Sequence, residues 1–156
     1  MRWTPLIAVA FAIAACGGGG QSEEDRVATA VRDYVKAFGE RDARRFCAKL
    51  FPSTNLPPAL ARKIGAPPGQ PGTPSTWERE SRRCARGFDR HGEYDQAAGG
   101  VDVKDVKLGA AVTGADGITR TASVMARLRK AKPGSKAQRL ELVEFRGDWK
   151  VVAAIN

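Results

Sequence analysis

The sequence predicts an α+β domain in which helices come first and an antiparallel sheet follows. Apolar residues recur at helical spacing through the first half of the chain and alternate with polar residues through the second half. Clusters of Gly, Pro, Asp and Ser separate the alternating segments and mark turns between strands. Helices followed by a run of strands are typical of a sheet that packs one face against the helices and shows the other to water.

The first predicted helix runs from Ser22 to Phe38. Ser22 can cap its start, and three acidic residues follow in the first turn, where negative charge is favourable beside the helix dipole. Gly39 is predicted to stop the helix, because glycine readily takes the left-handed conformation that often follows a helix. One face of this helix is apolar and consists of Val27, Ala30, Val31, Tyr34 and Phe38.

Two further short helices are predicted before a loop. Asp42 can cap a helix that runs to about Leu50 and that Pro52 ends. Residues 56–64 form a third helix with two prolines in its first turn, and residues 65–74 contain too much Gly and Pro for regular structure. The inward face of the second helix is formed by Ala43, Phe46, Cys47 and Leu50.

The fourth predicted helix, residues 76–88, is the cleanest amphipathic segment. Its apolar side lies within about 60° on a helical wheel and consists of Trp77, Ser81, Cys84 and Phe88. Its opposite side is basic and consists of Arg79, Arg82, Arg83, Arg86 and Arg90. Cys84 is therefore expected to face the core, as Cys47 does.

After a loop predicted over residues 91–100, alternation predicts four strands joined by turns. The first begins at Val101 and has a break in its alternation near Lys104-Asp105, which predicts a β-bulge. The second covers residues 121–128, the third includes residues 140–142, and the fourth runs over residues 149–155. Arg146-Gly147-Asp148 is interpreted as a hairpin turn, although the same tripeptide binds integrins in other proteins.

A targeting segment precedes these elements. Residues 1–15 hold one positive charge at Arg2 and then an almost wholly apolar run from Pro5 to Ala15, which is the layout of a secretory signal peptide. The run is about half the ~20 residues that a membrane-spanning helix needs. It ends in Ile13-Ala14-Ala15-Cys16, which resembles the lipobox of bacterial lipoproteins. The alternative is an ordinary signal peptide with an incidental cysteine.

The lipobox resemblance implies where the protein works. In that family a diacylglyceryl group is attached to the cysteine, and cleavage leaves the cysteine as the first residue. Cys16 would then be the lipidated residue, residues 16–22 a Gly-rich tether, and residues 23–156 the domain. Two acyl chains are enough for stable anchoring. The expected location is the extracytoplasmic face of a cell membrane, with the membrane itself as one partner.

The charge of the chain favours anionic partners. Lys and Arg number 26 against 17 Asp and Glu, a net charge of +9, and loss of Arg2 with the signal peptide would leave +8. A basic surface near a membrane favours anionic lipids or acidic envelope polymers, and a membrane protein is a further candidate partner. Nucleic acid is not expected as a partner, because an exported protein rarely meets it.

The remaining cysteines predict a disulfide. If lipid occupies Cys16, Cys47 and Cys84 form an even pair in an exported chain. Closing their loop of about 38 residues would contribute on the order of 4 kcal/mol in the chain-entropy model. The alternative is two buried free thiols. Two cysteines without nearby His or acidic residues do not make a zinc site, and no metal or cofactor is expected.

The order of elements resembles the nuclear transport factor 2-like superfamily, a cone-shaped α+β fold, over residues 23–156. Two stretches carry the resemblance: residues 27–42, an opening helix followed by Gly39 and the capping Asp42, and residues 145–152, which end in a G-x-W-x-V pattern. Small exported lipoproteins of this type often carry a cysteine on the second helix and another later. Members usually have a short hairpin between the second and third helices, where this chain has a Pro/Gly loop.

The resemblance implies a pocket inside the cone but little about chemistry. Ketosteroid isomerase-like and polyketide cyclase-like members line it with an Asp or His base and Tyr or Asp donors. Here the one histidine, His91, falls in a predicted loop, and the two tyrosines are Tyr34 and Tyr94. No positioned acid–base pair is evident, so no catalytic residue is assigned. The residues expected to line a pocket are Tyr34, Phe38, Trp77 and Trp149.

These observations predict a membrane-anchored envelope lipoprotein that acts as a non-catalytic binding or accessory module. One alternative is a small-molecule isomerase or cyclase. Another is electrostatic docking of the basic helix face to anionic lipid or cell-wall polymer, since guanidinium groups bind phosphates and carboxylates well. The simplest alternative for that face is a solvated helix surface without a partner.

Overall fold

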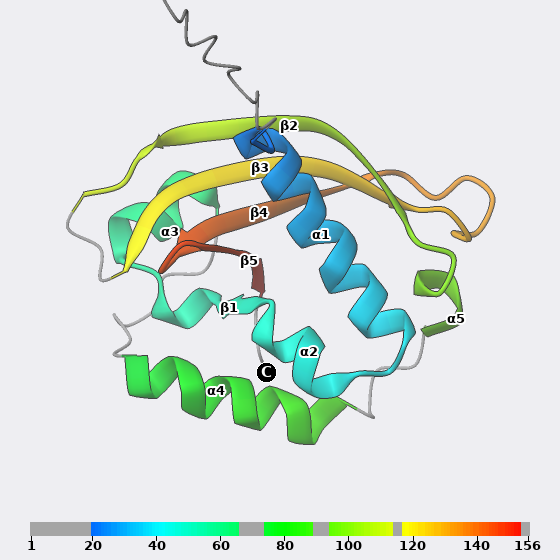
Figure 1. Cartoon of the computed structure of the whole chain (residues 1–156), viewed down its shortest axis with the longest axis horizontal. Coiled ribbons are helices and arrows are strands. Elements are labelled where there is room, and N and C mark those ends of the chain that lie inside the picture. The colour runs from blue at the N-terminus through cyan, green and yellow to red at the C-terminus, as the bar shows by residue number, and fades with distance from the viewer. Residues whose placement is uncertain (1–19, 66–73, 89–93, 114–116, 154–156) are drawn as a thin grey trace, which may run out of the picture.

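The computed structural model describes residues 20–65, 74–88, 94–113 and 117–153, and within residues 74–77 it describes the backbone alone. A curved sheet forms the centre of the domain (Figure 1). Helix α1 (Glu23–Gly39) lies across one face of the sheet, and α3 (Pro58–Ile64) covers the other face at one end. The predicted signal segment and Cys16 lie outside the described residues.

Helix α1 begins as predicted and ends at Gly39, one residue later than predicted, but its end has another geometry. The Ser22 hydroxyl accepts a hydrogen bond from the backbone N–H of Asp25 at 3.1 Å, and Val27 and Val31 are completely buried. Gly39 is the last helical residue and not the left-handed residue after the helix; that conformation falls on Arg41, at φ 58°. Glycine is required at position 39 because α1 packs closely against Ala98 at this point. A Cβ on residue 39 would lie 2.7 Å from the backbone nitrogen of Ala98.

Helix α2 (Ala43–Ala48) is capped by Asp42, whose carboxylate accepts from the N–H of Arg45 at 3.0 Å. The prediction that this helix reaches Leu50 is wrong, because Leu50–Pro52 forms strand β1. A short apolar run fits either a helix or a strand, and here its pairing with the distant strand β5 (Asp148–Ala153) makes it a strand. Burial lowers the pKa of Lys150 in β5, and its ammonium group donates to the carbonyl of Ala48 at 2.7 Å.

The segment after β1 contains a single 3-10 turn, η1 (Ser53–Asn55), and then α3, which ends at Gly65 in the left-handed conformation with φ 71°. Helix α4 (Pro74–Gly87) corresponds to the predicted amphipathic helix. A one-turn helix, α5 (Tyr94–Ala97), replaces part of the loop predicted over residues 91–100. Most of the predicted Pro/Gly loop, residues 66–73, lies outside the described residues.

The sheet is mixed, and not purely antiparallel as predicted. Its strand order is β1-β5-β4-β3-β2. The last four strands form the predicted antiparallel meander, whereas β1 pairs in parallel with β5, with Leu50 opposite Val151. The meander strands are β2 (Val101–Ala111), β3 (Ile118–Leu128), β4 (Gln138–Phe145) and β5 (Asp148–Ala153).

Local backbone features of the meander agree with the sequence. Asp105 has φ 51°, and the pairing of β2 with β3 shifts between Lys104 and Lys107, which confirms the predicted bulge. Arg146 and Gly147 have φ values of 53° and 84° between Phe145 and Asp148, so this tripeptide forms the predicted hairpin turn.

Two apolar clusters stabilise the two faces of the sheet. The larger one packs α1 residues such as Val27 and Val31 on Val124 and Leu142. The smaller one packs α3 on the other face and includes Phe51, Leu60, Ile118, Val143 and Phe145. A register shift after Ile118 lets this residue join the smaller cluster although Ala122 and Val124 of the same strand join the larger one. Among the described residues, no helix has the length and apolar character to cross a membrane.

Candidate functional site

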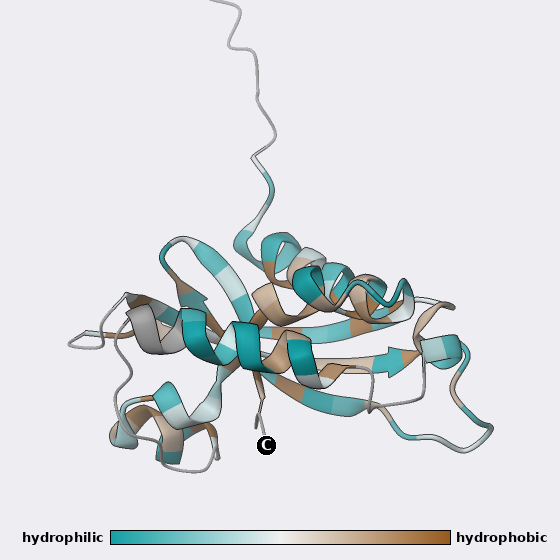
Figure 2. Cartoon of the chain, turned by 90° about the horizontal axis from the view of Figure 1, so that it is seen from below, coloured by the Kyte–Doolittle hydropathy of each residue, from teal (hydrophilic) through white to brown (hydrophobic). Residues whose placement is uncertain are grey.

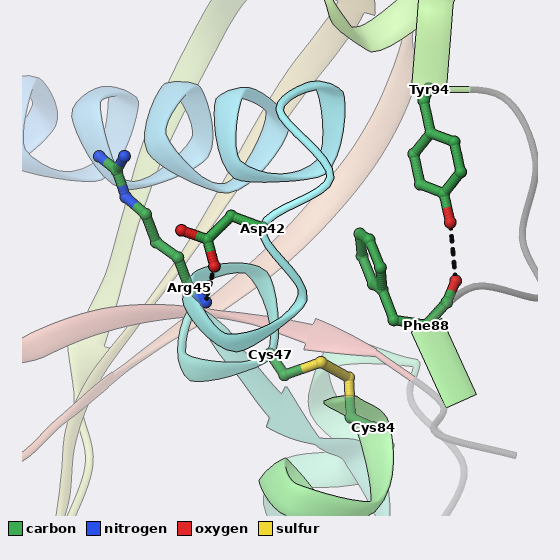
Figure 3. The surroundings of a disulfide bond; sticks show 6 residues. All are labelled: Asp42, Arg45, Cys47, Cys84, Phe88 and Tyr94. Atoms are coloured by element: carbon green, nitrogen blue, oxygen red, sulfur yellow. Dashed lines mark hydrogen bonds between the residues drawn. A yellow bond between two sulfur atoms is a disulfide. The ribbon is translucent and has the colours of Figure 1, made fainter. Parts of the chain in front are cut away.

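A disulfide and a group of aromatic rings join the helices at the C-terminal end of α1. Cys47 of α2 and Cys84 of α4 are bonded, with an S–S distance of 2.06 Å, as predicted from the sequence (Figure 3). The side chain of Cys47 is fully buried. The bond attaches α4 to the rest of the domain near the point where the aromatic side chains gather.

The rings of Tyr34, Phe38, Phe46, Phe88 and Tyr94 form what we call the aromatic cluster. Phe38 is at its centre, with ring centroids 5.2 Å from Phe46, 5.7 Å from Phe88 and 4.9 Å from Tyr94. Tyr34 stacks on Phe46 at 4.8 Å. The Tyr94 hydroxyl donates to the backbone carbonyl of Phe88 at 2.8 Å (Figure 3). These contacts hold two side chains of α1, Tyr34 and Phe38, in defined positions.

Tyr34 and Phe38 form one wall of a cavity of about 390 Å³. The cavity lies between the C-terminal half of α1, helix α5 and the ends of β2, β3 and β4, and the loop between β3 and β4 borders its mouth. The opposite wall is apolar and includes Val101, Leu128 and Leu140. A concave, mostly apolar pocket with a few polar groups is the usual form of a small-molecule site.

The mouth of this cavity is basic. Arg127, Lys132 and Lys136 line it and are exposed. In the part of the chain that the structure describes, no carboxylate lies within ion-pair distance of these three cations. The other polar lining groups are neutral side chains, Gln96, Ser135 and Gln138. The mouth therefore combines positive charge that is not in close ion pairs with hydrogen-bonding groups.

Burial raises the pKa of Tyr34 to about 12. The hydroxyl therefore keeps its proton throughout the physiological range and remains able to donate a hydrogen bond. It is the one ionisable side chain with a raised pKa among the described lining residues, and its proton is held too strongly for a general acid at neutral pH.

A second hollow of about 410 Å³ lies on the surface between α1 and residues 97–100. Two of its three cations already have partners, because Lys36 pairs with Glu40 at 3.8 Å and Arg129 pairs with Asp102 at 2.8 Å; the third is Arg32. No aromatic side chain lines it among the described residues. The cavity beside Tyr34 is therefore the better candidate for a ligand site.

Of the four residues that were predicted to line a pocket, two line this cavity, one lies in the core, and the side chain of the fourth is not described. Tyr34 and Phe38 line the cavity, but Trp149 does not: it is 4% exposed and packs in the larger core cluster. Trp149 pairs with Glu144 beside the β4–β5 turn, under the start of α1, whereas the cavity lies at the other end of that helix. The side chain of Trp77 lies outside the described residues.

Sequence patterns do not reveal the three cations of the cavity mouth. Lys132 and Lys136 belong to a segment in which the sequence predicts only a turn, and alternation places Arg127 on the outward side of a strand. The available signal is the accumulation of Lys and Arg in residues 127–136 between two strands. That signal cannot indicate which end of the sheet the loop covers.

The basic helix face is also present in α4. Arg79, Arg82, Arg83 and Arg86 are exposed, and none of them lies within 4 Å of a carboxylate in the described part of the chain. Figure 2, seen from the side of α4, shows hydrophilic residues along its outward surface. Arg90 lies outside the described residues. We call these four side chains the arginine face.

Residues that could act in catalysis are not assembled at the cavity. Asp33 pairs with Lys49 at 3.5 Å, the Tyr94 hydroxyl is bonded to Phe88, and His91 lies outside the described residues. The described cavity lining contains no carboxyl or imidazole group. Within the described ranges there is also no group of three side chains suited to hold a metal ion.

Comparison with known proteins adds no relative. The chain has no significant match among family models, curated proteins or solved structures. The structure alone therefore defines the class of this protein, an α+β domain with a mixed five-stranded sheet and a small, mostly apolar cavity at one end of its long helix.

Proposed function

We propose that this protein is a lipid-anchored envelope module that binds a small molecule in the cavity beside Tyr34 and does not transform it. The observation that supports the proposal most is the cavity itself: apolar walls, a basic mouth, and a described lining without a carboxylate or imidazole. Binding needs shape and a few oriented polar groups, whereas acid–base catalysis needs a group with a pKa near the working pH.

The architecture supports a nuclear transport factor 2-like domain as the scaffold. Three features agree with the resemblance: the order of helices before strands, a long first helix across a curved sheet, and a cavity at one end of that helix. Between its second and third helices, where such proteins usually have a hairpin, this chain has β1 and η1. Strand β1 pairs with β5 and so extends the sheet on that side.

The Ile13-Ala14-Ala15-Cys16 sequence supports the lipid anchor. We expect Cys16→Ser to move the protein from the membrane fraction to the soluble fraction of the cell envelope, because the acyl chains supply most of the membrane affinity. Cys84→Ser, which breaks the disulfide but leaves the lipobox intact, is the control and should remain in the membrane fraction. Unchanged fractionation of Cys16→Ser would refute lipid anchoring.

Binding in the cavity can be tested with a neutral fluorescent probe, N-phenyl-1-naphthylamine. We expect saturable binding with one site per chain. Ala131 lines the cavity and is only half-buried, so Ala131→Trp should fill the mouth and abolish binding. Ala110→Trp, on exposed β2 surface, is the matched control and should bind as the unmodified protein does. If neither this probe nor an anionic analogue shows saturable binding, the proposed function is refuted.

A second proposal concerns the arginine face, which we propose contacts an acidic polymer of the envelope. In Figure 1 α1 begins at the top of the domain and α4 lies along the bottom. Helix α1 has 17 residues, which corresponds to a length of about 25 Å. An anchor joined to the start of α1 would hold that side near the membrane and direct the arginine face away from it.

The polymer proposal predicts salt-dependent binding to long-chain polyphosphate, a polyanion without acyl chains. Replacing Arg79, Arg82 and Arg86 by Gln should weaken binding on the order of 10- to 100-fold at low salt, at about 1 kcal/mol for each charge near an anionic surface. Replacing Lys104, Lys107 and Lys63 by Gln removes the same charge elsewhere and is the control. Equal weakening by both variants would show a general charge effect and contradict the proposal.

A further inference from the structure

We infer that the ligand of the cavity is a small amphipathic anion, with an apolar ring or short chain inside and a carboxylate, sulfonate or phosphate group at the mouth. The inference rests on the proposed binding function and adds the chemical class of the ligand. It follows from the separation of apolar and cationic groups within one site.

The inner walls are suited to an apolar body. Tyr34 and Phe38 form the helix side, and Leu128 and Leu140 form the sheet side. The aromatic cluster holds both rings from behind, since Phe38 contacts three other rings and Tyr34 stacks on Phe46. Preformed walls reduce the entropy lost when a ligand binds. Burial of apolar area would supply most of the affinity.

The cations at the mouth border apolar lining residues. Some cations elsewhere in the described domain are paired, as Lys49 is with Asp33, Arg129 with Asp102 and Arg139 with Glu141, whereas the arginine face is exposed and unpaired. Arg127, Lys132 and Lys136 have no carboxylate within 4 Å in the described ranges, although Arg127 lies opposite Asp102, the partner of Arg129, in the β2–β3 pairing. Three cations without a close ion pair beside an apolar surface attract an anion and repel a cationic ligand.

The arrangement also gives the ligand an orientation. All three cations are exposed and lie on β3 and the loop that follows it, whereas the aromatic side chains come from α1. An anionic group would stay at the mouth, partly hydrated, while the apolar body enters between the helix and the sheet. The Tyr34 hydroxyl, which burial keeps protonated, can donate to a polar atom of the body.

The volume restricts the size of the ligand. About 390 Å³ is near the lower end of the range for sites that take drug-sized molecules. A small ring system or a short acyl chain fits this space, and the body of a long-chain lipid does not. The ligand is therefore expected to be a free small molecule.

A matched pair of fluorescent probes tests the inference. 8-Anilinonaphthalene-1-sulfonate has the same aromatic body as N-phenyl-1-naphthylamine and adds one sulfonate. We expect the sulfonate probe to bind about tenfold more tightly, because ion pairs with the mouth stabilise the charged probe alone. Replacing Arg127, Lys132 and Lys136 together by Gln should remove this tenfold preference and change the affinity for the neutral probe less than about twofold.

The control is the Gln triple variant of Arg79, Arg82 and Arg86, which removes the same charge from α4 and should keep the preference for the sulfonate probe. Circular dichroism and thermal unfolding establish that each variant is folded. If both probes bind with equal affinity and Ala131→Trp blocks both, the inference is overturned while the proposed function stands. If neither probe binds, the proposed function fails as well. Equal loss of the preference in both triple variants would also overturn the inference.

Discussion

The cavity mouth and the arginine face carry similar charge in different surroundings. The mouth has three cations beside apolar walls, on a strand and a loop. The arginine face has four cations on the outer surface of one helix, with water on the exposed side. Charge beside an apolar cavity can select a small amphipathic anion, because one molecule satisfies both parts of the site.

The arginine face, in contrast, lines neither of the two described cavities. Flat, solvated cations gain little from a single small anion, since water and salt screen each pair. They act together on a polyanion, which contacts several of them at once. The number of positive charges is therefore a poor guide to function, because the surface around the charges determines which partner can bind.

The largest expected effect is the loss of stability when the disulfide is removed. It tests whether the cavity and the arginine face are independent of each other. The disulfide attaches α4 to α2, whereas the cavity is built from α1, α5 and the sheet. Cys47→Ala/Cys84→Ala should lower the free energy of unfolding by about 4 kcal/mol, measured by urea denaturation. Trypsin should then cut faster after the arginines of α4, because the helix opens locally more often.

Binding of the sulfonate probe, measured below the unfolding transition, should change less than about twofold in this variant. Reduction of the unmodified protein is an independent control and should give the same increase in cleavage. Because Phe88 follows α4 and contacts Phe38, the two regions also share the aromatic cluster. A loss of probe binding in a folded, disulfide-free protein would show that α4 supports the cavity and that the two regions are not independent.

The next largest effect concerns Tyr34, on the wall of the cavity, and its contribution to stability at alkaline pH. The pKa of Tyr34 is about 12 in the folded chain and 10.0 in an unfolded one. Between pH 10 and pH 12 Tyr34 is deprotonated in the unfolded chain but still protonated in the folded chain. The free energy of unfolding therefore falls as the pH rises above 10. Below pH 10 the full contribution, on the order of 2–3 kcal/mol, is present.

Tyr34→Phe removes this ionisation, so its stability should depend less on pH above 10 than that of the unmodified protein. Urea unfolding of both proteins between pH 8 and pH 11.5 measures the difference. Parallel stability curves would indicate that the Tyr34 hydroxyl ionises normally and is therefore not buried at the cavity wall.

The smallest expected effect is the difference between Gly→Ala substitutions at the last residue of α1, Gly39, and at the last residue of α4, Gly87. Gly39→Ala places a Cβ against the backbone of Ala98, beside the helix that supplies Gln96 and Ala97 to the cavity. We expect a loss of about 1–3 kcal/mol and weaker probe binding, because backbone must move. A Cβ added at Gly87 would have no neighbour within 4 Å in the described part of the chain, so Gly87→Ala should be neutral or stabilise by up to about 1 kcal/mol.

Thermal and urea unfolding of the two alanine variants measure this contrast directly. Equal effects at both positions would mean that the end of α1 is packed no more tightly than the end of α4. The cavity would then lack the rigid wall that its proposed selectivity requires.

Much of the fold follows from local sequence patterns. Ser22 and Asp42 cap helices as predicted, because capping depends on residues three positions away. Helical spacing directs both Cys47 and Cys84 inward, where they are bonded. The break in alternation at Lys104-Asp105 marks a bulge, and Arg146-Gly147 marks a hairpin.

Features that depend on distant segments follow from the tertiary structure alone. Leu50 lies in a strand because β5 pairs with it, and Gly39 is needed because Ala98 lies against it. Trp149 packs in the core and not in the cavity, since the turn beside it lies at the other end of α1. Arg127, Lys132 and Lys136 form one site only because the β3–β4 loop borders the end of the sheet. Periodicity and caps are set by neighbours along the chain, whereas a cavity is set by residues that folding alone brings together.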